Sequence, residues 1–237
     1  MHSTDPASGL VLEEVAIRLD GRLLLEIDCG IRPGSVLTIM GESGSGKSSL
    51  LDYVAGFLNP AFDATGRVVL DGRNLTSLPA QERHIGLMFQ APLLFPHMSV
   101  LQNLMFAIPA SVKDRQRRRE MAEQALEDVG LGGFGPRDPA TLSGGQQTRV
   151  ALMRTLLAEP RALLLDEPFS SLDRSRRADV RSLVFDLARQ KQLPVLLVTH
   201  DEEDAEAAGE MIHRLEKRDM LTCVGRGAYS AMSADLA

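Results

Sequence analysis

Four short runs of almost unbroken apolar residues restrict the fold of this chain more than any other feature. A strand covered on one face alternates apolar and polar residues, whereas a parallel strand covered on both faces is apolar throughout. Each run is followed by a polar or glycine-rich element, and in an open α/β sheet such elements meet beyond the carboxyl ends of the strands. We therefore expect a parallel sheet with a ligand site along one edge. The runs are residues 36–40, 85–89, 162–165 and 195–198, and they are followed by Gly41, Gln90, Asp166-Glu167 and Thr199-His200.

Two Asp-Gly pairs predict an antiparallel β part in the first third of the chain. Asp-Gly between apolar stretches is a strong signal for a tight hairpin turn, because both residues tolerate a positive φ. Asp20-Gly21 separates the apolar stretches 10–19 and 23–27, and Asp71-Gly72 follows the apolar run 68–70. We expect one hairpin at each pair.

Helical patterns dominate the stretch between the second and third apolar runs. We expect helices over residues 115–129 and 145–158, the latter ended by Pro160, since proline cannot continue a helix. No internal repeat and no Gly-, Pro- or Ser-rich linker divides the chain. We therefore predict one domain over residues 1–237, with a core from 10–90 and 160–215, a helical subdomain over 91–159 and a short extension over 216–237.

The composition favours a globular protein that stays in the cytoplasm and binds no nucleic acid. Hydrophobic residues make up 44% of the 237 residues, and the net charge of −6 disfavours binding to a phosphate backbone. The amino-terminal residues lack the basic flank and the apolar stretch of a secretory signal. The two cysteines, Cys29 and Cys223, form no CxxC pair, which disfavours a disulfide or a zinc site.

One stretch has the length of a membrane span without its composition. Residues 91–112 contain no Asp, Glu, Lys or Arg, and a spanning helix needs about 20 apolar residues. However, Pro92, Pro96 and Pro109 would leave backbone groups unpaired in lipid. We interpret the stretch as part of the folded protein.

The sequence GESGSGKS, from Gly41 to Ser48, fits the phosphate-binding pattern GxxxxGK[ST]. It follows an apolar run and precedes an expected helix over residues 48–57, which is the context that this pattern requires. The glycines let successive N–H groups face phosphate oxygens, and the start of the helix adds positive potential. We expect Lys47 to be exposed in an open loop and to reach the outer phosphates, and the Ser48 hydroxyl to bind Mg²⁺.

The sequence ALLLDEP places two carboxylates, Asp166 and Glu167, directly after a buried strand. At this edge of the sheet they would reach both a hydrated Mg²⁺ and a water that attacks a phosphate. We expect Asp166 to hold the metal shell and Glu167 to orient or deprotonate the water. Alone, the pair would be interpreted as solvated acidic residues at a strand exit, and the phosphate loop is what favours the catalytic interpretation.

The third motif is LSGGQ, residues 142–146, at the start of the second expected helix. Its serine is expected to cap that helix, and its glycines expose backbone donors that suit an anion. LSGGQ between a phosphate loop and an acidic strand end resembles the nucleotide-binding domains of the ATP-binding-cassette (ABC) family. The resemblance implies an α/β P-loop NTPase with a RecA-like parallel-sheet core, an N-terminal antiparallel β part and an inserted helical subdomain, using ATP and Mg²⁺. The motif consists of Leu142, Ser143, Gly144, Gly145 and Gln146.

The resemblance, which extends from Leu10 to Glu203, assigns further residues. Gln90 matches the Q-loop position, which senses Mg²⁺ and the transport partner, Asp173 matches the D-loop, and His200 matches the histidine that contacts the γ-phosphate. In this family each ATP lies between the phosphate loop of one cassette and the LSGGQ of another, so the resemblance implies a second copy of this chain as a partner. The implied ATP-binding residues are Gly41, Glu42, Ser43, Gly44, Ser45, Gly46, Lys47, Ser48, Ser49 and Gln90, the catalytic residues Glu167 and His200, and the metal-binding residues Ser48, Gln90 and Asp166.

One position departs from the family pattern. Members commonly stack adenine on an aromatic side chain well before the phosphate loop, and there is no aromatic residue between Leu10 and Gly30. Leu19 or Asp20 occupies the corresponding place. We therefore expect the adenine to rest on apolar contact alone.

The apolar stretch from Leu93 to Asn103 is similar to the segment that follows the Q-loop in import-type cassettes, where a helix of the membrane subunit docks. The alternative is a core segment of the helical subdomain, and we expect docking with part of the stretch buried. The implied partners are integral membrane permease subunits and a separate solute-binding protein, with this chain peripheral on the inner face of the cell membrane. The competing class is a soluble ABC ATPase that acts as an assembly factor or clamp, which the acidic charge and the lack of a coiled coil disfavour.

Overall fold

The computed structural model describes residues 8–42, 44–209, 211–215 and 220–222. The strands of this part of the chain are β1 (Leu10–Leu19), β2 (Arg22–Ile31), β3 (Val36–Met40), β4 (Phe62–Leu70), β5 (Arg73–Asn74), β6 (Ile85–Met88), β7 (Ala162–Asp166), β8 (Val195–Thr199), β9 (Ile212–Arg214) and β10 (Met220–Thr222). The α-helices are α1 (Lys47–Ala55), α2 (Val100–Ala107), α3 (Arg115–Asp128), α4 (Gly144–Leu157), α5 (Arg174–Gln190) and α6 (Glu202–Ala208). The strands form two sheets, in the orders β10-β2-β1-β4-β5 and β6-β7-β8-β3-β9.

The second sheet is parallel and contains all four apolar runs, as predicted. Its three inner strands β7, β8 and β3 are buried on both faces, because helices cover one side and the first sheet with α1 lies on the other. Along β7, Leu163 and Leu165 belong to one hydrophobic core and Leu164 belongs to the other. This two-sided burial is the physical reason for the unbroken apolar pattern. The strand β9 adds an edge that the sequence did not reveal, and it pairs in parallel with β3.

The first sheet holds both predicted hairpins. β1 and β2 pair antiparallel up to Leu19 and Arg22, around Asp20-Gly21, and β4 and β5 pair around Asp71-Gly72. β10 joins the outer edge of this sheet, parallel to β2. It lies within the predicted extension 216–237, whose other residues lie outside the described part of the chain.

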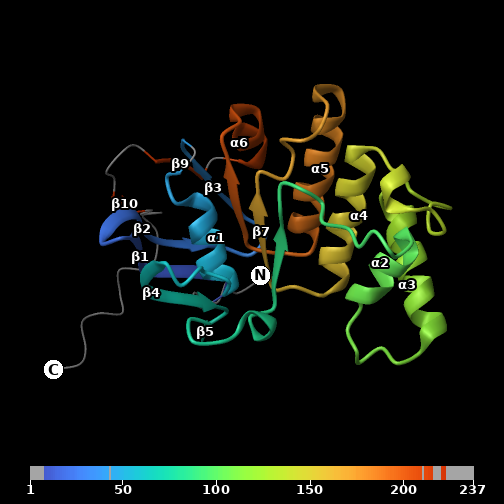
Figure 1. The fold of residues 1–237 in the computed structure, drawn as a ribbon, viewed down its shortest axis with the longest axis horizontal. Helices are drawn as coiled ribbons and strands as arrows, with labels where there is room; N and C mark the ends of the chain where they lie inside the picture. The colour runs from blue at the N-terminus through green and yellow to red at the C-terminus, as the bar shows by residue number, and fades with distance from the viewer. Residues whose placement is uncertain (1–7, 43, 210, 216–219, 223–237) are drawn as a thin grey trace, which may run out of the picture.

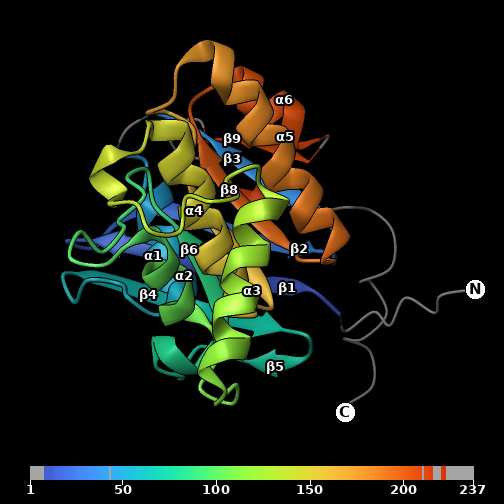
Figure 2. The ribbon, with the colours of Figure 1, turned by 90° about the vertical axis from the view of Figure 1, so that its right-hand side faces the viewer.

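The two hydrophobic cores give the molecule its layers. Leu50, Leu51 and Val54 of α1 pack into the core between the two sheets, while α2 to α5 pack on the other face of the parallel sheet. Figure 1 shows the first sheet and α1 at one end of the molecule and α2, α3 and α4 at the other. Figure 2, turned by 90°, shows α3 standing in front of the parallel sheet.

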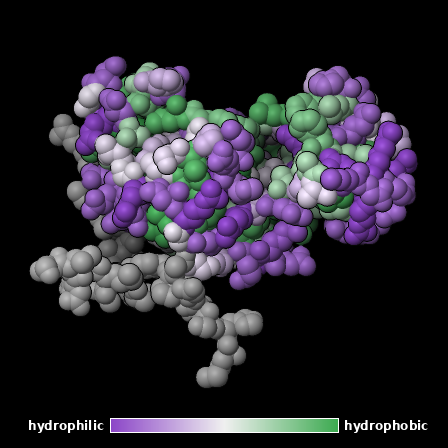
Figure 3. All heavy atoms as spheres, turned by 90° about the horizontal axis from the view of Figure 1, so that it is seen from below, coloured by the Kyte–Doolittle hydropathy of each residue, from purple (hydrophilic) through white to green (hydrophobic). Residues whose placement is uncertain are grey.

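The helical subdomain contains one α-helix more than the two predicted, namely α2. Ser99 and Gln102 form a capping box at its start, since each side chain bonds the backbone N–H of the other residue. Val100 and Leu104 are fully buried. No helix in the described part of the chain combines the length and the apolar character needed to cross a membrane. Seen from below, the helical subdomain is set apart from the two-sheet body by a notch with hydrophobic atoms along it (Figure 3).

Candidate active site

The phosphate loop joins the carboxyl end of β3 to the start of α1. Gly46, at the N-cap of α1, has a φ of 89° and Gly44 a φ of 82°, which residues with a side chain rarely adopt. A Cβ on Gly46 would also lie 3.2 Å from Cβ of Leu24. The loop therefore presents the first N–H groups of α1 in the manner of an anion site. Of the predicted ATP-binding residues, Ser43 lies outside the described residues.

The structure contradicts the expectation that Lys47 is exposed. The side chain is 6% exposed, and its Nζ donates to the carbonyl oxygens of Gly41 and Glu42, both at 2.7 Å, and to Oγ of Ser45 at 3.2 Å. Burial lowers the pKa of Lys47, and the carboxylates of Glu167 and Asp166 partly oppose this. The ammonium group thus donates hydrogen bonds to its own loop. A phosphate bound in the loop would compete with these oxygens as an acceptor.

Asp166, the last residue of β7, lies beside the phosphate loop. The Ser48 hydroxyl donates to Oδ1 of Asp166 at 3.3 Å. Burial raises the pKa of Asp166, as does the charge of Glu167, while the hydrogen bond from Ser48 and the charge of Lys47 lower it. The structure therefore brings together two of the three predicted metal-binding residues, Ser48 and Asp166, one from each motif.

Glu167 follows in a left-handed conformation, with a φ of 45°. Its N–H donates to the carbonyl of Val198 at 2.9 Å, and its carbonyl accepts from the Ser170 hydroxyl at 2.9 Å. Nδ1 of His200 lies 3.0 Å from Oε1 of Glu167. The two predicted catalytic side chains, from β7 and from the end of β8, are therefore in direct contact.

The oxygen donors beside the phosphate loop suit a metal ion that is also coordinated by a bound ligand. The described residues contain no group of three or more His, Cys, Asp or Glu side chains that could hold a metal ion alone. Mg²⁺ binds few protein oxygens and completes its shell with water and substrate phosphates. The hard oxygens of Ser48 and Asp166 beside a phosphate loop match that requirement. Gln90, the third predicted metal-binding residue, lies after the end of β6 and is exposed.

The LSGGQ residues begin α4 as predicted. Ser143 and Gln146 form a capping box, in which Ser143 N–H donates to Oε1 of Gln146 at 2.9 Å and Gln146 N–H donates to Oγ of Ser143 at 3.4 Å. Asp173 stands at the N-cap of α5, but its exposed side chain accepts no capping hydrogen bond. Neither this aspartate nor any LSGGQ residue lines the hollow beside the phosphate loop.

That hollow has a volume of about 370 Å³ and contains an aromatic residue that sequence reasoning missed. Phe62, at the start of β4, pairs with Leu19 at the end of β1, so a ring from a distant segment lies beside the place where no aromatic was found. The only signal for it was the pairing of the two strands. The lining residues are Leu19, Leu24, Gly44, Gly46, Lys47, Ser48, Ser49, Phe62 and Glu167.

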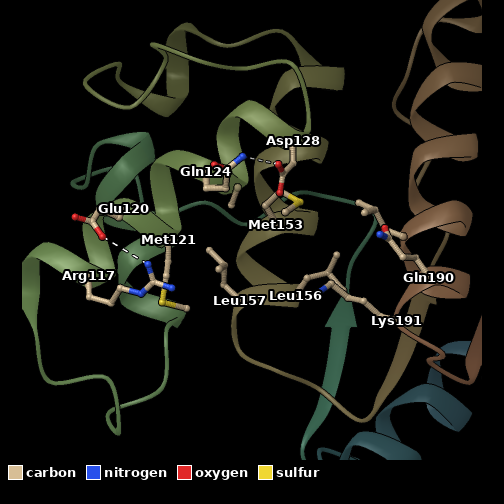
Figure 4. Close-up of a pocket in the computed structure, with 12 residues that line it drawn as sticks. Arg117, Glu120, Met121, Gln124, Asp128, Met153, Leu156, Leu157, Gln190 and Lys191 are labelled. Atoms are coloured by element: carbon tan, nitrogen blue, oxygen red, sulfur yellow. Dashed lines mark hydrogen bonds and ion pairs between the residues drawn. The ribbon is translucent and has the colours of Figure 1, made fainter.

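A larger hollow, of about 780 Å³, lies between α3, α4 and α5 and is shown in Figure 4. Its size does not make it the active site, because none of the motif residues lines it. Its walls combine methionine and leucine side chains with charged and amide side chains of the helix surfaces. These residues are Arg117, Glu120, Met121, Gln124, Ala125, Asp128, Met153, Leu156, Leu157, Leu187, Gln190 and Lys191.

Two ion pairs that the sequence did not reveal hold the segment after His200. Arg181 of α5 donates to Oδ1 of Asp204 at 2.9 Å, and Asp204 is 1% exposed. Arg177 of α5 pairs with Asp201, the residue that caps α6. Both contacts fix α6 against α5 and so fix the backbone that carries His200.

Comparison with known proteins identifies the family of this chain. The family model described as ABC transporter matches residues 24–170, which include the phosphate loop, LSGGQ and the carboxylate pair. The chain is 45% identical over 204 residues to the uncharacterized ABC transporter ATP-binding protein YnjD of Escherichia coli (strain K12), which covers 86% of this chain and 94% of YnjD.

The chain is also similar to longer proteins. It is 43% identical over 182 residues to the Fe(3+) ions import ATP-binding protein FbpC of Brucella abortus (strain 2308), covering 77% of this chain and 51% of that protein. It is 42% identical over 187 residues to the FbpC 1 protein of Rhizobium meliloti (strain 1021), covering 79% and 52%. It thus spans about half the length of these relatives. With a matching family model over most of its length, a phosphate loop, and a carboxylate pair beside it, the chain belongs to the ABC transporter family and is an ATP-binding subunit with ATPase activity.

Proposed function

We propose that this chain drives import of a solute through permease subunits that are separate chains. The observation that carries this proposal is an apolar surface, the docking patch, formed by Leu93, Phe95 and Phe106. Leu93 is 56% and Phe106 62% exposed, and the rings of Phe95 and Phe106 meet edge to face with centroids 5.0 Å apart. Exposed aromatic and leucine side chains that cluster on a protein surface favour a protein contact.

The docking patch is tied to the helix that begins with LSGGQ. Arg154 of α4 donates to the carbonyl oxygen of Leu93 at 3.0 Å, and its guanidinium lies 5.2 Å from the centre of the Phe95 ring. A force on the patch would therefore reach α4 directly. This connection supports a motor role, in which nucleotide binding and a membrane partner act on the same helix.

The predicted docking stretch divides into two parts. Its second half is core, because Val100 is buried and Asn103, also buried, bonds the backbone of Phe95 and Met98. Its first half carries Leu93 and Phe95 of the docking patch, and the third member, Phe106, follows the stretch on α2. The division matches the expectation that only part of the stretch would be buried, and it supports docking at the first half.

For hydrolysis, we propose that the phosphate loop and Lys47 bind the phosphates of ATP while Glu167 accepts or orients the proton of the attacking water. His200 would contact the γ-phosphate and hold the Glu167 carboxylate in place. Ser48 and Asp166, with Gln90, would hold Mg²⁺, which neutralises charge on the phosphate oxygens. The contacts of Ser48 with Asp166 and of Glu167 with His200 support these roles.

We propose that two copies of the chain assemble head to tail. LSGGQ and Asp173 lie apart from the hollow at the phosphate loop of their own chain. The capped start of α4 offers backbone donors to an anion, and the Asp173 side chain is exposed. Both features suit a site that is completed by a second copy.

The names of the FbpC relatives support import as the direction of transport. We propose that the permease and a separate solute-binding protein select the solute, and that the chain works peripherally on the inner face of the cell membrane. The competing function is a soluble ATPase that acts as an assembly factor or clamp. The docking patch favours the transporter.

Reconstitution tests the proposal. The chain should sediment with vesicles that contain the permease subunits encoded beside it, and its ATP hydrolysis should rise when the solute-binding protein is loaded. Vesicles without permease are the control. ATP hydrolysis with no association to any permease vesicle would instead support the soluble factor.

A further inference from the structure

The hollow beside the phosphate loop has two chemically different walls. One consists of loop residues and Glu167, with backbone N–H groups, hydroxyls and charges. The other consists of Leu19, Leu24 and Phe62, from β1, β2 and β4. A ligand that fills this hollow of about 370 Å³ needs a polar, anionic end and a flat apolar end.

Phe62 is held at this wall by its strand and by the turn before it. Its backbone N–H donates to the carbonyl of Asn59 at 2.9 Å, and the Asn59 side chain accepts from the N–H of Ala61 at 2.9 Å. On the other side, Phe62 pairs with Leu19 in the register of β1 and β4. The side chain is half-buried against the core between the sheets, so one part of the ring packs inward and the rest faces solvent.

Leu24 completes the contact between this wall and the phosphate loop. The position that a Cβ of Gly46 would take lies 3.2 Å from Cβ of Leu24. The apolar wall therefore begins directly beside the N-cap of α1, where the phosphates bind. A nucleotide whose phosphates occupy the loop would place its base within reach of this wall.

We propose that Phe62, supplied by β4 rather than by the turn between β1 and β2, is the aromatic platform on which the base of the nucleotide stacks. This inference rests on nucleotide binding at the phosphate loop. Aromatic rings and bases stack through their π faces without a requirement for a particular base. The polar residues that line the hollow belong to the phosphate loop or are Glu167. The apolar wall of Leu19, Leu24 and Phe62 therefore contacts the flat face of a base and forms no hydrogen bonds with its edge.

A fluorescent reporter tests the contact directly, because the chain contains no tryptophan. Phe62→Trp creates a single tryptophan whose emission should change on addition of Mg-ATP. The matched control is Phe57→Trp, since Phe57 is 62% exposed and lies beyond the far end of α1. Its emission should not change. An unchanged emission of Phe62→Trp at saturating Mg-ATP would overturn the proposal.

Affinities separate the base contact from the phosphate contact. Phe62→Ala should weaken Mg-ATP binding by about tenfold and leave the binding of inorganic tripolyphosphate unchanged, whereas Lys47→Ala should weaken both. Phe62→Tyr should bind Mg-ATP as the wild type does, and the affinities for ATP and GTP should differ by less than about tenfold because both purines stack.

Wild-type ATP affinity in Phe62→Ala would overturn the proposal while the loop assignment stands. Wild-type affinities in Lys47→Ala would overturn the loop assignment itself. If Phe62→Ala unfolds, two other variants still test whether the base stacks on Phe62. These are the Phe62→Trp reporter and Phe62→Leu, which keeps the apolar volume but lacks the ring.

Discussion

Nδ1 of His200 lies 3.0 Å from Oε1 of Glu167, which links the carboxyl ends of the adjacent strands β7 and β8. The backbone of Glu167 is fixed as well, by hydrogen bonds to Val198 and from Ser170. The Glu167 carboxylate is thus held by His200, and the backbone that carries it is held by Val198 and Ser170, so the side chain is positioned before any water arrives. We infer that His200 orients Glu167 in addition to its proposed contact with the phosphate.

His200→Asn should therefore lower the rate of ATP hydrolysis by about 100-fold, as expected for the loss of a positioned polar group, with little change in ATP affinity. A phosphate-release assay and equilibrium binding measure the two quantities. His84→Asn is the matched control, because His84 is exposed and has a φ of 53°, which asparagine tolerates. If both variants hydrolyse ATP equally fast, His200 has no role at the site.

Lys47→Ala should reduce Mg-ATP affinity by at least about 100-fold while the chain stays folded. The variant leaves the carbonyls of Gly41 and Glu42 without the ammonium, but it also removes a charge whose burial lowers the pKa of Lys47. The lost hydrogen bonds destabilise the fold and the removal of the buried charge stabilises it, so the two effects oppose each other. Calorimetry gives the affinity and thermal unfolding gives the stability, and Lys191→Ala, on the surface at the end of α5, is the control. Unchanged affinity in the folded variant would remove Lys47 from the phosphate site.

Much of this architecture could be predicted because its causes are local or periodic. The parallel strands showed as apolar runs since both faces of each strand are covered, and Ser143 was recognisable as a cap from the LSGGQ motif itself. The start of α2 also carried a signal, the serine and glutamine of the Ser99 capping box, which went unused because the surrounding apolar stretch was interpreted as a docking segment.

The features that were not predicted depend on contacts between distant segments. Phe62 lies after the phosphate loop in the sequence and reaches the hollow beside that loop only through the register of β1 and β4. Lys47 is buried because the loop carbonyls turn inward around its ammonium. Asp204 is held by Arg181 across the packing of α5 on α6. None of these is visible in a motif or a periodicity.

Asp166→Asn should unfold at a higher temperature than the wild type at pH 8. Burial raises the pKa of Asp166, so the folded state favours the protonated carboxyl, and stability is lost as the pH rises through the folded-state pKa. Asparagine is neutral at every pH and avoids this loss, so the difference should shrink toward pH 4. Hydrolysis should fall and lose its dependence on Mg²⁺. Asp186→Asn, which breaks only an exposed pair with Arg189, should change neither property. Equal unfolding temperatures at pH 8 would contradict the prediction.

Leu93→Asp should abolish association with permease vesicles without affecting the fold, because Leu93 is exposed in the docking patch. Leu94→Asp is the contrasting variant. Leu94 packs on the core of the helical subdomain, so a charge there should destabilise the folded chain. Sedimentation with vesicles and thermal unfolding distinguish the two. A folded Leu93→Asp variant that binds vesicles and supports transport as the wild type does would show that the docking patch is elsewhere.

Glu167→Gln should bind Mg-ATP normally and hydrolyse it at least about 100-fold more slowly, because glutamine keeps the shape of the side chain and cannot accept a proton from water. If ATP closes two copies head to tail and hydrolysis reopens them, the variant should accumulate as an ATP-bound dimer. Gel filtration with and without Mg-ATP measures this, beside a phosphate-release assay.

The contrast with Asp166→Asn makes the Glu167→Gln experiment specific. Both variants lose turnover, but only Glu167→Gln keeps Ser48 and Asp166 for the metal, so only this variant should form a Mg²⁺-dependent dimer. Adding Lys47→Ala to Glu167→Gln should abolish the dimer, because the phosphates are then no longer held. Hydrolysis at the wild-type rate in Glu167→Gln would show that another group accepts the proton, and the contact between Glu167 and His200 would then have a structural role only.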